Sequence, residues 1–197
     1  MTMPVRQIDG RLCIVRIELS PSEIPSLLAK HAENYPGVPA CEALGQELIQ
    51  SGFDPDASVE FVQQVCKWGR GDRNISRVRR NNSASEVALA LSEGLDLART
   101  GKVAHGVERI RCLRNLGQSF ASKQMRFLDP ARAVVMDSVI RNRLGYAETA
   151  NGYAEFLSDC QAILVHVRKS DQLPEPERLR ISDIEAALFT KLQGSSK

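Results

Sequence analysis

The sequence predicts a mainly α-helical fold, an array of about nine to ten short helices with a possible short strand or hairpin at the N-terminus. Two observations predict this fold. From residue 20 onward, apolar residues recur at helical spacing, and Ser, Asp, Pro and Gly separate the apolar runs at short intervals. Strand-like alternation with β-branched residues is confined to residues 11–19. The length of 197 residues fits a single domain, expected over residues 1–197.

The elements are expected in the following order. Residues 1–19 form an N-terminal arm or strand. The first helix begins at Ser20, which can cap it, while Pro21 fits the first turn and Glu23 completes a capping box. Further helices are expected over residues 41–51, 56–68, 72–81, 83–101, 103–115, 118–128, 131–144 (split near Asp137), 149–169 and from residue 182. The chain then divides into a helical half (20–112), a segment with unusual polar residues (113–146) and C-terminal helices (147–193).

Composition excludes several classes of protein. No apolar run approaches the roughly 20 residues that span a bilayer, and the N-terminus lacks the pattern of a secretory signal. Five scattered cysteines form no CxxC pair, which favours reduced thiols in a cytoplasmic protein. His31, His105 and His166 lie in separate segments, so we expect no metal site, and no motif indicates an organic cofactor. The sequence carries no signal for an oligomeric state.

Charge is distributed unevenly along the chain. Residues 67–143 hold 16 Lys and Arg against 7 Asp and Glu, a net charge of +9, whereas the remaining residues carry −7, which gives the overall +2. Such a field attracts a polyanion to one region of the surface. A solvated, Arg-rich helical surface would show the same bias, but we expect nucleic acid, and DNA in particular, as the partner.

Lys123 occupies an unusual place for a lysine. On a helix, Leu116, Phe120, Lys123 and Phe127 fall on one stripe, which is otherwise apolar. A buried ammonium is costly unless it is paired, and desolvation lowers the pKa of an amine, as an amine nucleophile requires. The alternative is that the stem of Lys123 follows the stripe while its charge remains in water.

Asp137 is the candidate partner of Lys123. It stands between the apolar run Ala133–Met136 and a helical pattern that ends at Gly145. A carboxylate at this position would cap the helix, which is a purely structural role. The functional alternative is that the fixed carboxylate stabilises a positively charged transition state or activates a nucleophile.

These residues resemble a known family. The order Leu-Gly-x-x-x-Ala-Ser-Lys over residues 116–123, then an apolar helix, Pro130, an apolar run and Asp137, is similar to the active-site half of helix-hairpin-helix DNA glycosylases. More narrowly it resembles bacterial proteins with the 8-oxoguanine DNA glycosylase (OGG) fold, and residues 180–189 resemble their closing helix. The resemblance covers residues 113–146 well and residues 1–66 hardly at all.

The resemblance implies base excision, with Lys123 as the Schiff-base nucleophile and Asp137 as the catalytic carboxylate. A damaged or modified base, with 8-oxoguanine as a candidate, would be extruded from the duplex because its glycosidic bond is unreachable in the stack. Trp68 and Phe120 are candidates for the base pocket, although a tryptophan is more often part of a core. The implied phosphate contacts are Arg70, Arg73, Arg77, Arg79, Arg80, Ser119 and Ser122.

The sequence departs from the family in two places. The family hairpin carries a Gly-x-Gly turn, whereas here Gly117 is the single glycine, and the separation of 14 residues from Lys123 to Asp137 is about one helical turn shorter. Two further hypotheses therefore stand beside a glycosylase. One is a non-catalytic nucleic-acid-binding or interaction protein on the same scaffold, and the other is a helical regulatory module that binds an acidic protein.

Overall fold

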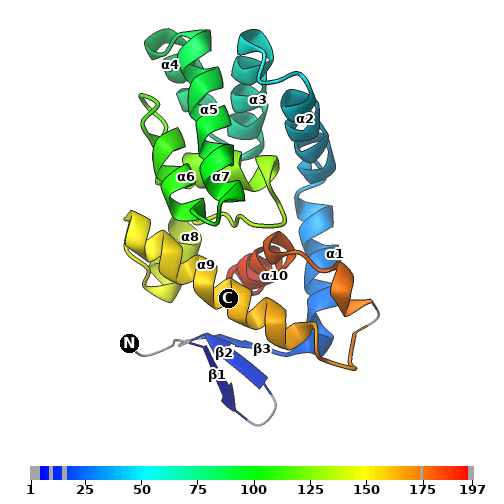
Figure 1. Cartoon of the computed structure of the whole chain (residues 1–197). Coiled ribbons are helices and arrows are strands. Elements are labelled where there is room, and N and C mark those ends of the chain that lie inside the picture. The colour runs from blue at the N-terminus through cyan, green and yellow to red at the C-terminus, as the bar shows by residue number, and fades with distance from the viewer. Residues whose placement is uncertain (1–4, 9–10, 15–16, 174, 195–197) are drawn as a thin grey trace.

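The computed structural model of the chain describes residues 5–8, 11–14, 17–173 and 175–194. Ten α-helices make up most of these residues, and a small sheet lies at the N-terminal end (Figure 1). The expected mainly helical fold is therefore confirmed. The sheet is antiparallel in the order β1 (Val5–Ile8), β2 (Arg11–Ile14), β3 (Ile17–Leu19). Residues 1–4, 9–10 and 15–16 of the expected N-terminal arm lie outside the described residues.

The helices follow the expected order closely. The capping box at Ser20 is present, with the Ser20 amide donating to Glu23 Oε2 at 2.9 Å, but it opens a 3₁₀ turn before the first α-helix. The bounds are η1 Pro21–Glu23, α1 Ile24–Asn34, α2 Val38–Gln50, α3 Pro55–Trp68, α4 Asp72–Asn81, α5 Ala84–Arg99, α6 Val103–Arg111, α7 Gln118–Leu128, α8 Ser138–Leu144, α9 Ala150–Val167, η2 Pro176–Arg178 and α10 Ile181–Gly194.

The expected helix over residues 131–144 is wrong in its first half. Residues 132–137 contain no helix, and the helix begins only at Ser138. Ala133–Met136 are fully or almost fully buried, so this segment runs through the interior as extended chain. Part of its backbone bonds to side chains, as when the Val134 amide donates to Tyr153 Oη and the Met136 amide to Ser122 Oγ.

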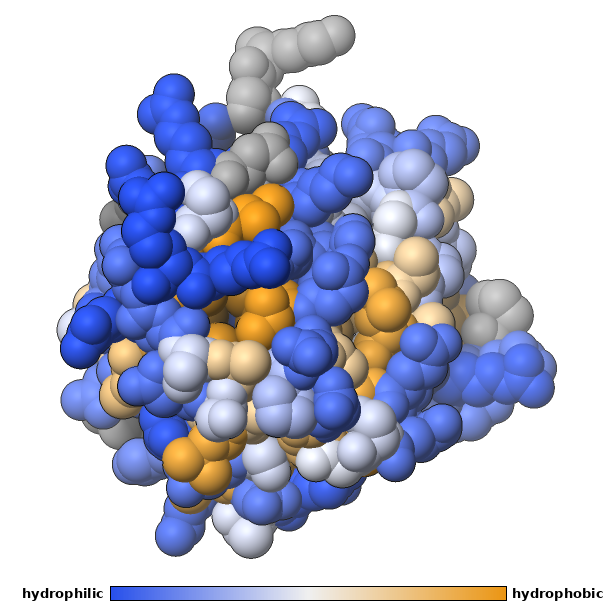
Figure 2. Space-filling view, turned by 90° about the horizontal axis from the view of Figure 1, so that it is seen from above, coloured by the Kyte–Doolittle hydropathy of each residue, from blue (hydrophilic) through white to orange (hydrophobic). Residues whose placement is uncertain are grey.

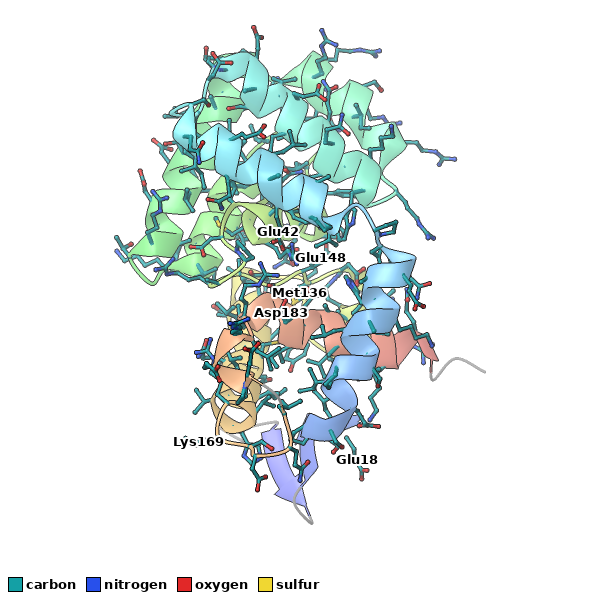
Figure 3. The ribbon with its side chains drawn as sticks, turned by 90° about the vertical axis from the view of Figure 1, so that its right-hand side faces the viewer. Glu18, Glu42, Met136, Glu148, Lys169 and Asp183 are labelled. Carbon is teal, nitrogen blue, oxygen red and sulfur yellow. The ribbon has the colours of Figure 1, made fainter. Side chains whose placement is uncertain are left out.

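The helices form two groups. Figures 1 and 3 show α2–α7 gathered at one end of the molecule, with α1, α9, α10 and the sheet at the other. The buried segment around Met136 passes between the groups (Figure 3). Glu42 of α2 joins them, since it accepts hydrogen bonds from Arg126 at 2.6 Å and from Arg180, just before α10, at 2.8 Å. Within the part of the chain that the structure describes, no helix combines the length and apolarity needed to cross a membrane.

Candidate active site

A cavity of about 210 Å³ lies where the two groups of helices meet. Its walls come from α1, α3, α7, α10 and the segment before α8, so elements distant in sequence build it together. Five charged residues line it: Arg70, Lys123, Arg126, Asp137 and Glu185. Aromatic rings line it as well: His31, Tyr35, Trp68 and Phe189. The volume is smaller than the roughly 300–1,000 Å³ of pockets for drug-sized ligands, which suits a single planar base.

Lys123 lies in the cavity wall with only 6% of its surface exposed. Phe127, one turn further along α7, is buried too, as is Leu116 in the loop before this helix, so the lysine does not extend to water. Nζ donates a hydrogen bond to Ser119 Oγ at 2.9 Å and lies 5.1 Å from the centroid of the Phe120 ring. Burial lowers the pKa of Lys123, although the nearby Asp137 and Glu185 oppose that shift. The net direction of the shift is downward, which favours the neutral amine relative to an exposed lysine.

Asp137 caps α8 and lines the cavity at the same time. Its Oδ1 accepts hydrogen bonds from the amides of Val139 at 2.9 Å and Ile140 at 3.1 Å. Capping the helix and placing a carboxylate beside Lys123 are therefore compatible roles. The cap holds the Asp137 carboxylate in the same cavity wall as Lys123. The separation of 14 residues is sufficient to bring both groups into one cavity.

Glu185 is a cavity residue that the sequence analysis missed. It lies on α10 with 5% of its surface exposed, and the Val135 amide hydrogen-bonds to it. Burial raises the pKa of Glu185 to about 8, against the opposing effects of Arg126 and Lys123. The sequence does contain a signal for Glu185, a charged residue within the apolar run Ile184–Phe189. Lys123 interrupts its apolar stripe in the same way.

The hairpin between α6 and α7 contains a residue in the left-handed conformation. In Leu113-Arg114-Asn115-Leu116-Gly117, Asn115 has φ +68°. Asparagine tolerates this conformation better than most other residues. The turn with the single glycine Gly117 therefore includes a left-handed residue two positions before it.

Comparison with known proteins identifies the family. The family model described as "Putative 8-oxoguanine DNA glycosylase OGG-like protein" matches residues 44–189. The chain belongs to this OGG-like family. No curated protein and no solved structure gives a significant match. The suspected resemblance is thus confirmed, and the match extends further towards the N-terminus than the motifs indicated.

Membership in the OGG-like family makes this a glycosylase-like protein at the level of the family, with DNA as the substrate that the family implies. The matched residues include Lys123, Asp137 and Glu185. The cavity walls supplied by His31 and Tyr35 of α1 lie outside the match. Among the residues that the structure describes, no cluster of three His, Cys, Asp or Glu side chains could hold a metal ion.

The structure separates the two aromatic candidates for the base pocket of this OGG-like protein. Trp68 lines the cavity, where its ring meets Phe127 edge to face at 4.7 Å between centroids. Phe120 is not among the lining residues, and it lies beside Lys123 and against Gly71. Trp68 therefore packs against the core and also lines the cavity, and its contact with a base stays a prediction.

The expected phosphate contacts lie in different environments. Arg70 lines the cavity and has φ +57°, a conformation that usually requires glycine. The arginines of α4 are exposed: Arg73, Arg77, Arg79 and Arg80. Ser119 is half-buried and accepts the bond from Lys123. Ser122 is fully buried, donates to the Ser119 carbonyl and accepts from the Met136 amide, so its expected contact with a phosphate is wrong.

Proposed function

We propose that this OGG-like protein is a DNA glycosylase with lyase activity, in which Lys123 is the nucleophile and Asp137 the catalytic carboxylate. The observation that carries the proposal is the convergence of a buried amine and a fixed carboxylate on one cavity of about 210 Å³. The aromatic wall supplied by Trp68 and Phe189 suits a flat base that has left the duplex.

The chemistry follows from the residues. Lys123 Nζ, as a free amine, attacks C1′ of the extruded nucleotide, and the bond between C1′ and the base breaks with its electron pair leaving on the base. Asp137 stabilises the positive charge that develops on the sugar. Loss of a proton from the new amine and opening of the sugar ring give a Schiff base between Nζ and C1′, which borohydride reduces to a stable adduct.

Two features of the surface support binding of a DNA backbone. The exposed arginines of α4 follow directly after the cavity residue Arg70, so a strand could contact them while one nucleotide enters the cavity. Helix α7 begins directly after the hairpin residue Gly117, which has no side chain to cap the first amides, and helix N-termini attract phosphate.

Borohydride trapping on duplex oligonucleotides that carry 8-oxoguanine, uracil or an abasic site tests the proposal. We expect a covalent adduct with the wild type that disappears in Lys123→Gln, and slower base release in Asp137→Asn. Release of one base and not the others would identify the substrate. Salt-sensitive DNA binding without adduct or base release would contradict the proposal and favour a non-catalytic DNA-binding protein.

A further inference from the structure

Glu185 is the cavity carboxyl to which the proposed chemistry assigns no role. It enters the cavity from α10, whereas Lys123 enters it from α7, and both side chains are more than nine-tenths buried. Burying an ionised carboxyl group in such a pocket costs free energy unless the group is paired or protonated. The groups around Glu185 therefore decide what it can do.

Charged and titratable groups approach Glu185 from several elements. Helix α7 contributes Lys123 and Arg126, and the segment before α8 contributes Asp137. Helix α9, which packs behind α10, contributes the buried hydroxyl of Tyr153 and the buried thiol of Cys160. From α1, His31 lines the same cavity, and its pKa is lowered by burial and by Arg126.

Among these groups, only Lys123 must lose a proton for the proposed reaction. Arg126 is already paired with Glu42, with Nη1 2.6 Å from Oε1. Burial raises the pKa of the Tyr153 hydroxyl and that of the Cys160 thiol, so neither takes part as an anion. Asp137 is less suited to receive a proton, because two backbone amides hold its Oδ1 and a protonated carboxyl would weaken that cap.

We propose that Glu185 accepts the proton that Lys123 Nζ must lose before it attacks C1′, an inference that rests on the proposed function. The proton passes from the ammonium to the carboxylate, which gives a neutral amine and a neutral carboxylic acid, and no other bond changes. The buried pair then carries one proton and no net charge, so the cavity avoids the cost of two desolvated ions. The two opposite pKa shifts, down for Lys123 and up for Glu185, agree with this placement of the proton.

The test is the pH dependence of borohydride trapping on a duplex with an abasic site, which requires no knowledge of the excised base. The wild type is compared with Glu185→Gln, Glu185→Asp, Lys123→Gln and, as the matched control, the exposed Glu47→Gln of α2. We expect Glu185→Gln to slow adduct formation at pH 7 by about 10²-fold, the usual range for loss of a general base. The rate difference between Glu185→Gln and the wild type shrinks as pH rises, because the solvent then removes the proton from Lys123 Nζ.

Other roles of Glu185 give different results. If Glu185 acts only through its negative charge, Glu185→Gln lowers the pKa of Lys123 further and trapping at pH 7 becomes faster, which would overturn the inference. A deficit that is equal at all pH values indicates a structural role and overturns it as well. Glu185→Asp keeps a carboxyl group, and we expect its trapping rate to follow the pH profile of the wild type. This variant keeps the inference testable if Glu185→Gln fails to fold. Absence of any adduct that depends on Lys123 in the wild type would overturn the proposed function together with the inference.

Discussion

Lys123 can occupy its buried position because residue 69 has no side chain. A Cβ on Gly69 would lie 2.9 Å from Lys123 Cδ and 3.0 Å from Phe120 Cε1, closer than carbon atoms pack. Gly69 has φ −75°, which any residue can adopt, so the requirement for glycine is one of space. The loop after α3 therefore shapes the space around Lys123.

We expect Gly69→Ala to displace the stem of Lys123 and so to slow borohydride trapping by roughly 10²-fold, the scale of a misplacement of about 1 Å. Affinity for the abasic duplex changes little, because the exposed arginines remain. Single-turnover trapping and a DNA-binding titration measure the two effects separately. Trapping at the wild-type rate would show that the position of Nζ is not set by this contact.

Glu185 also makes the stability of the fold depend on pH. Its pKa is about 8 in the folded protein and roughly 4.3 in an unfolded chain. Below the lower value both states hold the proton of Glu185, whereas between the two values only the folded state does, so the contribution of Glu185 to the free energy of unfolding falls as pH rises towards 8. The lowered pKa of Lys123 contributes with the opposite sign, so the effect of Glu185 is read from the difference between the variant and the wild type. We expect Glu185→Gln to gain stability over the wild type at pH 8 relative to pH 5, by about 1.4 kcal/mol per pH unit at most.

Urea unfolding of both proteins at pH 5, 6.5 and 8 measures this dependence. If the difference in free energy of unfolding between the wild type and Glu185→Gln were the same at all three pH values, the prediction would be wrong. That result would show that Glu185 titrates alike in the folded and unfolded states. The same variant thus tests stability here and proton transfer in the trapping experiment, with independent readouts.

At the scale of elements, the hairpin before α7 is held by the end of α4. The Arg114 amide donates to Asn82 Oδ1 at 2.8 Å, and Asn82 Nδ2 donates to the Arg114 carbonyl at 3.1 Å. Asn81 Nδ2 donates to Asn115 Oδ1 at 2.5 Å. The helix that carries the exposed arginines and the hairpin that leads to Lys123 are therefore fixed to each other, and a strand bound to one is positioned for the other.

The left-handed turn at Asn115 gives a prediction at this scale. Asn115→Gly keeps the backbone conformation and loses only the bond from Asn81, whereas Asn115→Ala must adopt φ +68° with a Cβ. We expect the alanine variant to be less stable than the glycine variant by about 1–2 kcal/mol in urea unfolding. Equal stabilities would mean that the turn relaxes to another conformation.

At the scale of the whole molecule, the exposed arginines of α4 lie at one end. Figure 2 looks onto the end formed by α2–α5 and shows mostly hydrophilic side chains with small hydrophobic patches between them. The exposed arginines of α4 belong to this end, whereas Lys169 lies at the opposite end near the sheet (Figure 3). A DNA backbone is therefore expected to contact the end of the molecule that carries the α4 arginines.

We expect the double variant Arg77→Gln/Arg80→Gln to reduce the slope of log K against log salt for duplex binding by about 2, because each lost phosphate contact releases one counterion fewer. The control is Lys169→Gln, which should leave the slope unchanged. Fluorescence anisotropy between low and moderate salt measures the slopes. If the slope decreased equally in Lys169→Gln and in the double arginine variant, the effect would be diffuse electrostatics without a defined DNA-binding face.

Local signals made most of the fold predictable. Capping residues, proline and glycine predicted the helix order, and the α4 bounds agree with the expected 72–81. The failure at residues 131–137 has a physical cause, since an apolar run of this length fits a buried helix or a buried extended chain equally well. Its backbone bonds to Ser122 and Tyr153 come from distant positions, which no local pattern reveals.

The sequence by itself determined the helical architecture, the segregated charge and the candidacy of Lys123 and Asp137, because periodicity, capping and composition are local properties. Only the tertiary structure decided that Lys123 is buried, that Ser122 is inaccessible and that Glu185 from α10 shares the cavity. These facts depend on which faces of α1, α7 and α10 meet, and that is set by long-range packing. A charged residue in an apolar run is visible in the sequence, but the identity of its neighbours, which fixes its pKa and its chemistry, is not.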